Sequence, residues 1–298
     1  MKPLSHKRLI HLALIYCLVL TTPGSAADVK PAQAVVSSVI AAYRTSNPAM
    51  QVRVWQEQIT HPGRNPKYQE FLAERLREFE KTEFAFYRLD DPKIVALVSE
   101  VIRPALRLYR REDCFKIIII KHHLPVMMND SGVIMMISTG LIERAASDDE
   151  ILGHAAHEIG HDLFWRRTVH ARQLLELYLS GKATELQAKE AGEDLAKIEL
   201  ECDAFSSLSL AVMGRNPVPF GQYLLDVERD FPDYLPEYLP AVADRVQVIK
   251  AVIPIEAKHV APQQSEAFRK LKALLSSANH NHRTPRALSR QLCESFLI

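Results

Sequence analysis

The chain has 298 residues and a formal net charge of +1, and 47% of its residues are hydrophobic while 24% are charged. This composition is that of an ordinary folded globule, and it excludes a disordered or low-complexity protein. The basic residues are scattered along the chain, so the sequence offers no electrostatic footprint for nucleic acid, and we expect no such partner.

The first residues predict a secretory signal peptide. Three basic residues within the first eight positions precede an apolar run over residues 9–20, and small residues follow up to Ala27. These are the three regions of such a signal. The apolar run is shorter than the roughly 20 residues that span a bilayer. We therefore expect residues 1–27 to be removed, the mature chain to lack a membrane span, and the protein to be exported to a bacterial periplasm.

Residues 28–89 are expected to form an N-terminal helical segment. Its helices are interrupted at Asn47-Pro48 and at His61-Pro62-Gly63, where turn-forming residues gather. Residues 71–79 are charged and amphipathic. Asp91-Pro92 then opens a helix that runs to about residue 109.

Two segments of this mostly helical chain predict strands. Residues 115–120 include four consecutive isoleucines, a β-branched run that suits a buried strand. A turn signal at Asn129–Gly132 precedes a second candidate over residues 133–138. A third strand remains open. The expected fold class is mainly α with a small β-sheet, that is, α+β.

The next helix carries the most informative motif. Ser147–Glu150 reads as a capping box with acidic residues in the first helical turn. The sequence GHAAHEIGHD follows at residues 153–162. His157 and His161 are four residues apart, so both imidazoles lie on one face of this helix.

The rest of the chain is also expected to be mainly helical. A second long helical region should break near Gly181 or Gly192 and end at Gly214. The expected segments are this region (169–213), aromatic and proline-rich loops (220–240), a helix (241–252) and a polar helical tail (253–298).

The spacing His157-Glu158-x-x-His161 is the one that zinc hydrolases use on a helix. Two imidazoles one turn apart are metal ligands, and the glutamate beside them takes a proton from metal-bound water. His154 lies one turn earlier on nearly the same face. We expect it to be a hydrogen-bonded cleft residue, with a metal role as the alternative.

A third ligand has to come from elsewhere in the chain. One zinc protease class uses a histidine six residues after the second one, but Arg167 stands there. The other common solution is a glutamate on a later helix, with an aspartate four residues on that orients a ligand histidine. Glu199 and Asp203 have this spacing and share a helical face.

Four motifs together carry a family resemblance: ISTGLI at 137–142, DDEIL at 148–152, HEIGH at 157–161 and ELECD at 199–203. They resemble those of the zinc metallopeptidase family of HtpX and the CAAX prenyl endopeptidases, and most of all its soluble exported BepA-like bacterial branch. The likeness covers residues 90–252, about half of the chain.

This resemblance implies a gluzincin-type metallopeptidase domain over residues 90–252. It also implies one zinc ion per chain and a set of roles: zinc ligands His157, His161 and Glu199, the catalyst Glu158, and Asp203 behind a ligand histidine. The strand at 133–138 would be the edge strand on which an extended peptide lies.

Two positions depart from the family pattern. Cys202 stands where alanine is usual. The family's histidine-proline pair is here Leu239-Pro240, followed by Arg245, so a histidine that assists catalysis in relatives is missing. Arg245, Tyr234 and Tyr238 are the candidates for the transition-state donor.

The other histidines, methionines and cysteines have ordinary interpretations. His122-His123 is expected at the surface, and Met127-Met128 and Met135-Met136 in the core or in a groove. The mature chain keeps an odd number of cysteines, so no disulfide framework is expected. They are Cys114, Cys202 and Cys293.

The sequence thus predicts an exported zinc endopeptidase that cleaves unfolded or misassembled envelope proteins by Glu-assisted attack of zinc-bound water. Besides polypeptide substrates, envelope or outer-membrane assembly machinery is an expected partner. One alternative is a non-catalytic periplasmic chaperone or assembly factor on the same fold. Another is a di-iron bundle that pairs Glu158 and His161 with Glu256 and His259, although Pro254 disfavours the helix it needs.

Overall fold

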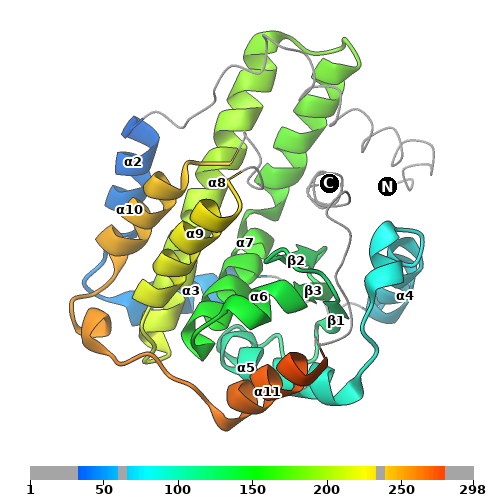
Figure 1. Cartoon of the computed structure of the whole chain (residues 1–298). Coiled ribbons are helices and arrows are strands. Elements are labelled where there is room, and N and C mark those ends of the chain that lie inside the picture. The colour runs from blue at the N-terminus through cyan, green and yellow to red at the C-terminus, as the bar shows by residue number, and fades with distance from the viewer. Residues whose placement is uncertain (1–32, 60–65, 233–238, 279–298) are drawn as a thin grey trace.

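The computed structural model describes residues 33–59, 66–232 and 239–278 (Figure 1). These residues form a mainly helical protein with one three-stranded sheet, which confirms the predicted α+β class. The predicted signal peptide lies outside them. Across the described ranges, no helix has the length and apolar character needed to cross a membrane.

The α-helices of the described residues are α2 (Gln33–Tyr43), α3 (Pro48–Gln58), α4 (Tyr68–Phe79), α5 (Pro92–Leu108), α6 (Thr139–Arg144), α7 (Asp148–Leu179), α8 (Glu185–Val212), α9 (Val218–Asp230), α10 (Val242–Val252) and α11 (Glu266–Ala278). Two short 3₁₀ helices accompany them, η2 (Glu83–Tyr87) and η3 (Glu256–His259). The strands are β1 (Lys116–Ile120), β2 (Met127–Asp130) and β3 (Ile134–Ser138).

Two helix starts in the N-terminal half confirm the predicted breaks. The Asn47 side chain accepts a hydrogen bond from the Met50 amide before α3, and the Asp91 side chain accepts from the amides of Lys93 and Ile94 before α5. Each of these caps precedes a proline at the first helical position, where a missing N–H costs nothing. The break predicted at residues 61–63 falls outside the described residues.

The sheet has the order β1-β3-β2, with β1 parallel and β2 antiparallel to β3. The strand predicted at 133–138 is therefore the central one, so its expected place at the edge is wrong. The edge strand beside α7 is β2, which the sequence did not predict as a strand. β1 is bordered on its other side by the segment at Arg88.

The isoleucine run of β1 is apolar throughout because both faces of the sheet are covered. On one face, residues 117 and 119 pack into the main core together with helices α5 and α7. On the other face, residues 118 and 120 pack against Tyr68 and Phe79 of α4. The sheet thus lies between two apolar clusters.

Helices α7 and α8 form a long hairpin that rises from the body of the molecule (Figure 1). The turn between them contains Gly181, whose φ of 72° favours glycine. Of the two predicted breaks, the one at Gly181 is correct, whereas α8 continues through Gly192. The predicted end at Gly214 is also confirmed, with a φ of 68°.

The start of α7 is correct but its cap differs from the predicted capping box. The Ser147 side chain makes no cap hydrogen bond to the helix. Glu150 instead reaches back to the Ala146 amide at 2.8 Å. The Asp149 carboxylate faces the amides of Asn216 and Gln263, so later parts of the chain help to hold this end of α7.

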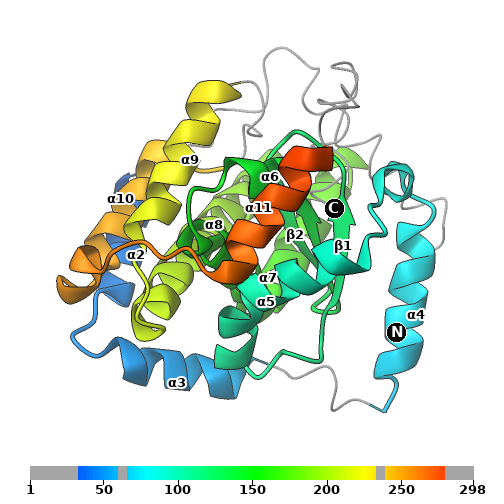
Figure 2. The ribbon, with the colours of Figure 1, turned by 60° about the horizontal axis from the view of Figure 1, so that its bottom comes forward.

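The C-terminal half corrects one further prediction. Residues 220–230, expected to be part of a loop region, lie in helix α9, in which Phe220, Tyr223 and Leu224 are buried. Helix α10 agrees with the predicted helix at 241–252. Helix α11 lies across α5 and α6 (Figure 2), and its apolar face joins the main core.

Candidate metal centre

The candidate site lies where α7 and α8 come closest. A Cβ atom added at Gly160 would lie 3.2 Å from Cys202 Sγ and 3.4 Å from its Cα. Glycine at this position lets the two helices approach, which brings side chains from both within ligand distance of one point. The helical spacing of the predicted residues places the polar side chains of each helix on the side that faces the other helix.

Two imidazoles and one carboxylate meet at this point. The rings of His157 and His161 lie 5.0 Å apart between their centroids. Glu199 of α8 reaches both, with Oε2 3.3 Å from His157 Nε2 and Oε1 3.5 Å from His161 Nε2. Two nitrogen donors and a carboxylate oxygen are the ligand types that zinc prefers in hydrolytic sites.

Asp203 lies behind His157 and is fully buried. Its Oδ1 is 2.9 Å from His157 Nδ1. Arg245 of α10 donates to both carboxylate oxygens, Nε to Oδ2 and Nη2 to Oδ1, each at 2.7 Å. A carboxylate in this position fixes the ring orientation and leaves Nε2 turned towards a metal.

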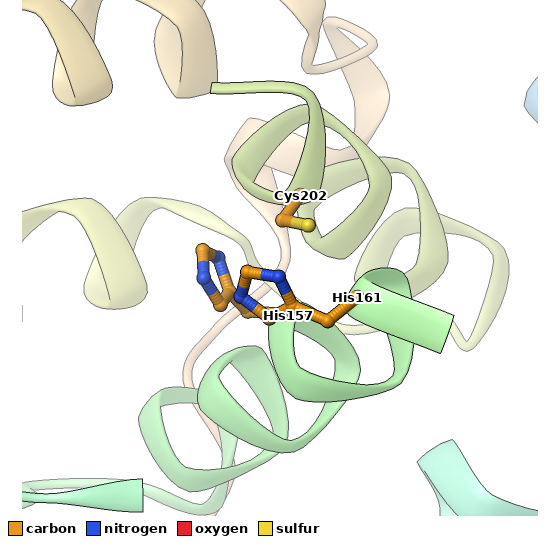
Figure 3. Close-up of side chains that lie close together, drawn as sticks. All are labelled: His157, His161 and Cys202. Carbon is orange, nitrogen blue, oxygen red and sulfur yellow. The ribbon is translucent and has the colours of Figure 1, made fainter. Parts of the chain in front are cut away.

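Cys202 also points into the gap between the helices (Figure 3). One nitrogen of each imidazole and Cys202 Sγ lie within 4.8 Å of one another, so these three residues could hold a metal ion. The oxygens of Glu199 lie 3.3 and 3.5 Å from the Nε2 atoms of the two rings. Burial, together with the charge of Glu199, raises the pKa of the Cys202 thiol well above its ordinary value. Glu199 is therefore the better third donor.

The surroundings shift the pKa values of the two imidazoles in opposite directions. Burial lowers the pKa of His157, but its hydrogen bonds to Asp203 and Glu199 outweigh burial and raise the pKa to about 9. For His161 burial prevails over the attraction of Glu199, and the pKa falls to about 4. Burial also opposes the charge on Glu199, yet both rings hold its pKa well below the ordinary value.

Glu158 lies beside the two histidines at the sheet. Its Oε2 accepts a hydrogen bond from the backbone N–H of Asn129 in β2 at 2.9 Å. Burial raises the pKa of Glu158 to about 7, against the opposing effect of His157. A carboxyl group with a pKa near neutrality is suited to proton transfer in both directions.

The remaining candidates from the sequence are His154, Arg245, Tyr234 and Tyr238. His154 lies between the rings of Phe220 and Tyr223, and its buried Nε2 has no hydrogen-bond partner among the described residues, contrary to the predicted hydrogen-bonded role. Arg245 is buried against Asp203 and does not face open space. Tyr234 and Tyr238 lie outside the described residues.

Two interpretations of histidines are wrong. Glu256 and His259 are exposed on η3, away from α7, so the inward-facing second half that a di-iron bundle requires is missing from that segment. His122 is buried, with a relative exposure of 3%, and its Nδ1 accepts a hydrogen bond from the Leu124 amide. The expected apolar role of the methionines holds, since Met127, Met135 and Met136 are buried.

Sequence reasoning missed the residues that join the sheet to α7. Asn129, predicted as part of a turn, lies at the end of β2 and contacts Glu158. Asp162, next to His161, pairs with Arg111. No local pattern links these residues, because they are separated by many positions in the chain.

A scan against protein-family models found no match to this chain, and a search of curated proteins found no similar sequence.

Proposed function

We propose that the protein is a zinc-dependent endopeptidase. The observation that carries the proposal is the position of Glu199 between the Nε2 atoms of His157 and His161, at 3.3 and 3.5 Å. Glu158, a carboxyl group with a pKa near 7, lies directly beside them. The resemblance to the HtpX and CAAX endopeptidase family supports the same conclusion from the sequence.

The residues present fit a zinc ion. His157, His161 and Glu199 would hold it, and three protein ligands leave the open position that a catalytic zinc site needs. When bound, zinc activates water and polarises a carbonyl group as a Lewis acid. Asp203 keeps His157 in the orientation and tautomer for this role, and Arg245 keeps Asp203 charged.

We assign to Glu158 the proton transfer between the attacking water and the leaving group. Its carboxylate accepts a proton from water as the scissile carbonyl is attacked, and then donates that proton to the leaving amide nitrogen. Burial favours both steps because it brings the pKa of the carboxyl group to about 7, near the pH at which the group has to accept and release a proton.

A polypeptide substrate is supported by the outer edge of β2. Val126 O accepts from the Ser138 amide, so residues 126 and 128 face β3. Residues 127 and 129 therefore face away from it, as alternation in an antiparallel pair requires. The N–H and C=O of Met127 and the C=O of Asn129 point away from β3, towards the side on which an extended peptide would add to the sheet beside Glu158.

The extended chain required by this edge points to unfolded or misassembled polypeptides as substrates. With the signal peptide expected at residues 1–27, we place their cleavage in the periplasm. Envelope or outer-membrane assembly machinery is the proposed source of these substrates.

The test is Glu158→Gln in the purified mature chain. Because glutamine cannot carry the proton, casein hydrolysis should fall by about 10²–10⁴-fold while one zinc per chain is retained. Glu176→Gln, on the same helix but away from the site, should leave both values unchanged. Zinc is measured by atomic emission.

Two results would count against the proposal. Absence of zinc from both proteins would remove its basis. Zinc retention without casein hydrolysis in either protein would favour a non-catalytic periplasmic chaperone on this fold. Equal hydrolysis in wild type and Glu158→Gln would contradict the role of Glu158.

A further inference from the structure

We propose that Asn129 is a positioning residue for Glu158, and that it acts by fastening the outer edge of β2 to helix α7. This inference rests on the proposed endopeptidase function. It assigns a role to a residue outside the HExxH motif and outside the ligand set.

Asn129 contacts Glu158 twice. Its backbone N–H donates to Glu158 Oε2 at 2.9 Å, and its side-chain Nδ2 donates to the Glu158 backbone oxygen at 2.8 Å. The first bond fixes one carboxylate oxygen and leaves Oε1 for the proton of the attacking water. The second bond holds the backbone from which this side chain projects.

The remaining polar atoms of the Asn129 side chain are also used. Nδ2 donates to Asp162 Oδ1 at 2.9 Å, and Oδ1 accepts from the Gly132 amide at 2.9 Å. The amide group therefore ties α7 to the turn between β2 and β3. No other residue type places two donors and one acceptor in these directions with so short a side chain.

A buried ion pair supports this contact from the far side. Arg111, with an exposure of 1%, donates to Asp162 Oδ2. With both oxygens bonded, Asp162 presents Oδ1 to Asn129 in a fixed direction.

The consequence is a rigid relation between the base and the edge strand. The N–H of Asn129 is committed to Glu158, so a bound peptide pairs with Met127 and with the Asn129 carbonyl. A displacement of Asn129 would shift Glu158 and the substrate strand relative to each other, and misplacement by about 1 Å can lower a rate about 10²-fold.

The test compares Asn129→Ala with Asp130→Ala in the mature, zinc-loaded protein. Asp130 is the matched control because it fastens the same turn to Arg75 of α4, at 2.8 Å, and has no contact with Glu158. Hydrolysis of a fluorogenic casein peptide, zinc content and thermal unfolding are measured for each.

For Asn129→Ala we expect kcat to fall about 10- to 100-fold, with KM and zinc content within about twofold of wild type. Asp130→Ala should keep kcat within about twofold. Should Asn129→Ala not fold, Asn129→Asp serves instead, since it keeps the shape and the acceptor for Gly132 but lacks both donors.

An unchanged kcat in the Asn129 variants, or an equal loss in Asp130→Ala, overturns the inference alone. A wild type that binds zinc but cleaves no faster than Glu158→Gln overturns the proposed function, and with it the catalytic role. Hydrogen exchange reports the contact independently of activity: the Asn129 amide should be protected in wild type and exposed in Glu158→Ala. Equal exchange in the two proteins would contradict the contact.

Discussion

Asp203 is the residue that connects His157 of the candidate site to Arg245. Its two oxygens receive three hydrogen bonds, one from the His157 ring and two from Arg245. Burial opposes the charge on Asp203, but Arg245 outweighs it and holds the pKa of the carboxyl group below its ordinary value. The negative charge at His157 Nδ1 is therefore permanent and makes the ring a stronger metal ligand.

Asp203→Asn is expected to weaken zinc binding by about 10- to 100-fold. Asparagine keeps the size of the side chain but lacks the charge. Its NH2 group cannot accept a hydrogen bond from Arg245. The measurement is competition with a chromophoric chelator. Glu201→Gln is the matched control, because Glu201 lies on the same helix and pairs with Arg167 at 2.5 Å. Equal zinc affinity in wild type and Asp203→Asn would contradict the role of this carboxylate.

Leu239 stands where the family that the sequence resembles has a histidine. Leu239 is half-buried at that position, and the arginine that follows, Arg245, is engaged with Asp203. Arg245 therefore acts on the site through Asp203, and in the proposed enzyme the transition-state donor would come from another group.

At the scale of elements, close contacts at glycines set the position of the helices around the site. A Cβ atom added at Gly153 of α7 would lie 2.6 Å from the ring carbon Cγ of Phe220 in α9. Ser206 of α8 donates to the Gly153 backbone oxygen at 2.6 Å. The contacts at Gly153 thus join α7, α8 and α9 one helical turn before His157.

Gly153→Ala is expected to destabilise the protein by about 1–3 kcal/mol, because the added methyl group overlaps the Phe220 ring. This occurs despite the better helix propensity of alanine, worth about 1 kcal/mol. In a Phe220→Ala background the cost should be smaller, since alanine lacks Cγ and Cδ2, two of the three nearest atoms. Urea unfolding of the four proteins in this double-mutant cycle measures the coupling. Additive effects would show that the ring does not limit this position.

At the scale of the whole molecule, α11 connects the last described residues to the centre of the protein. Lys272 Nζ donates to the backbone oxygens of Ile142, Glu143 and Ala145, at the end of α6. Phe268 and Leu271 of the same helix are buried in the main core. Residues near the C-terminus of the described chain therefore stabilise the helix that precedes α7.

Lys272→Met should lower the free energy of unfolding by about 1–2 kcal/mol, because three carbonyl oxygens lose a charged donor. Lys270→Met, on the exposed side of the same helix, should have no measurable effect, since Lys270 pairs only with exposed Glu266 there. Both values come from urea unfolding. Equal losses in the two variants would mean that the carbonyl contacts contribute nothing specific.

Local sequence alone was enough to predict most helices and the relative faces of the site residues. The spacing of His157 and His161, and of Glu199 and Asp203, fixes their directions within each helix because the helical repeat is local. Caps such as Asn47 and Asp91 act on amides two or three residues away, so the starts of α3 and α5 were also predictable.

Tertiary structure alone decided which strand lies at the edge, that 218–230 is helical, and which groups surround Glu158. β2 is short and polar at its end, and it becomes a strand only because β3 pairs with it. Residues 218–230 contain a proline and a glycine, and they form α9 by burying apolar side chains against α7 and α10. Asn129 and Glu158 are 29 residues apart, and their contact depends on how the sheet packs on the helix. Such pairings are set by long-range packing energies, which outweigh local propensity and leave no trace in short patterns.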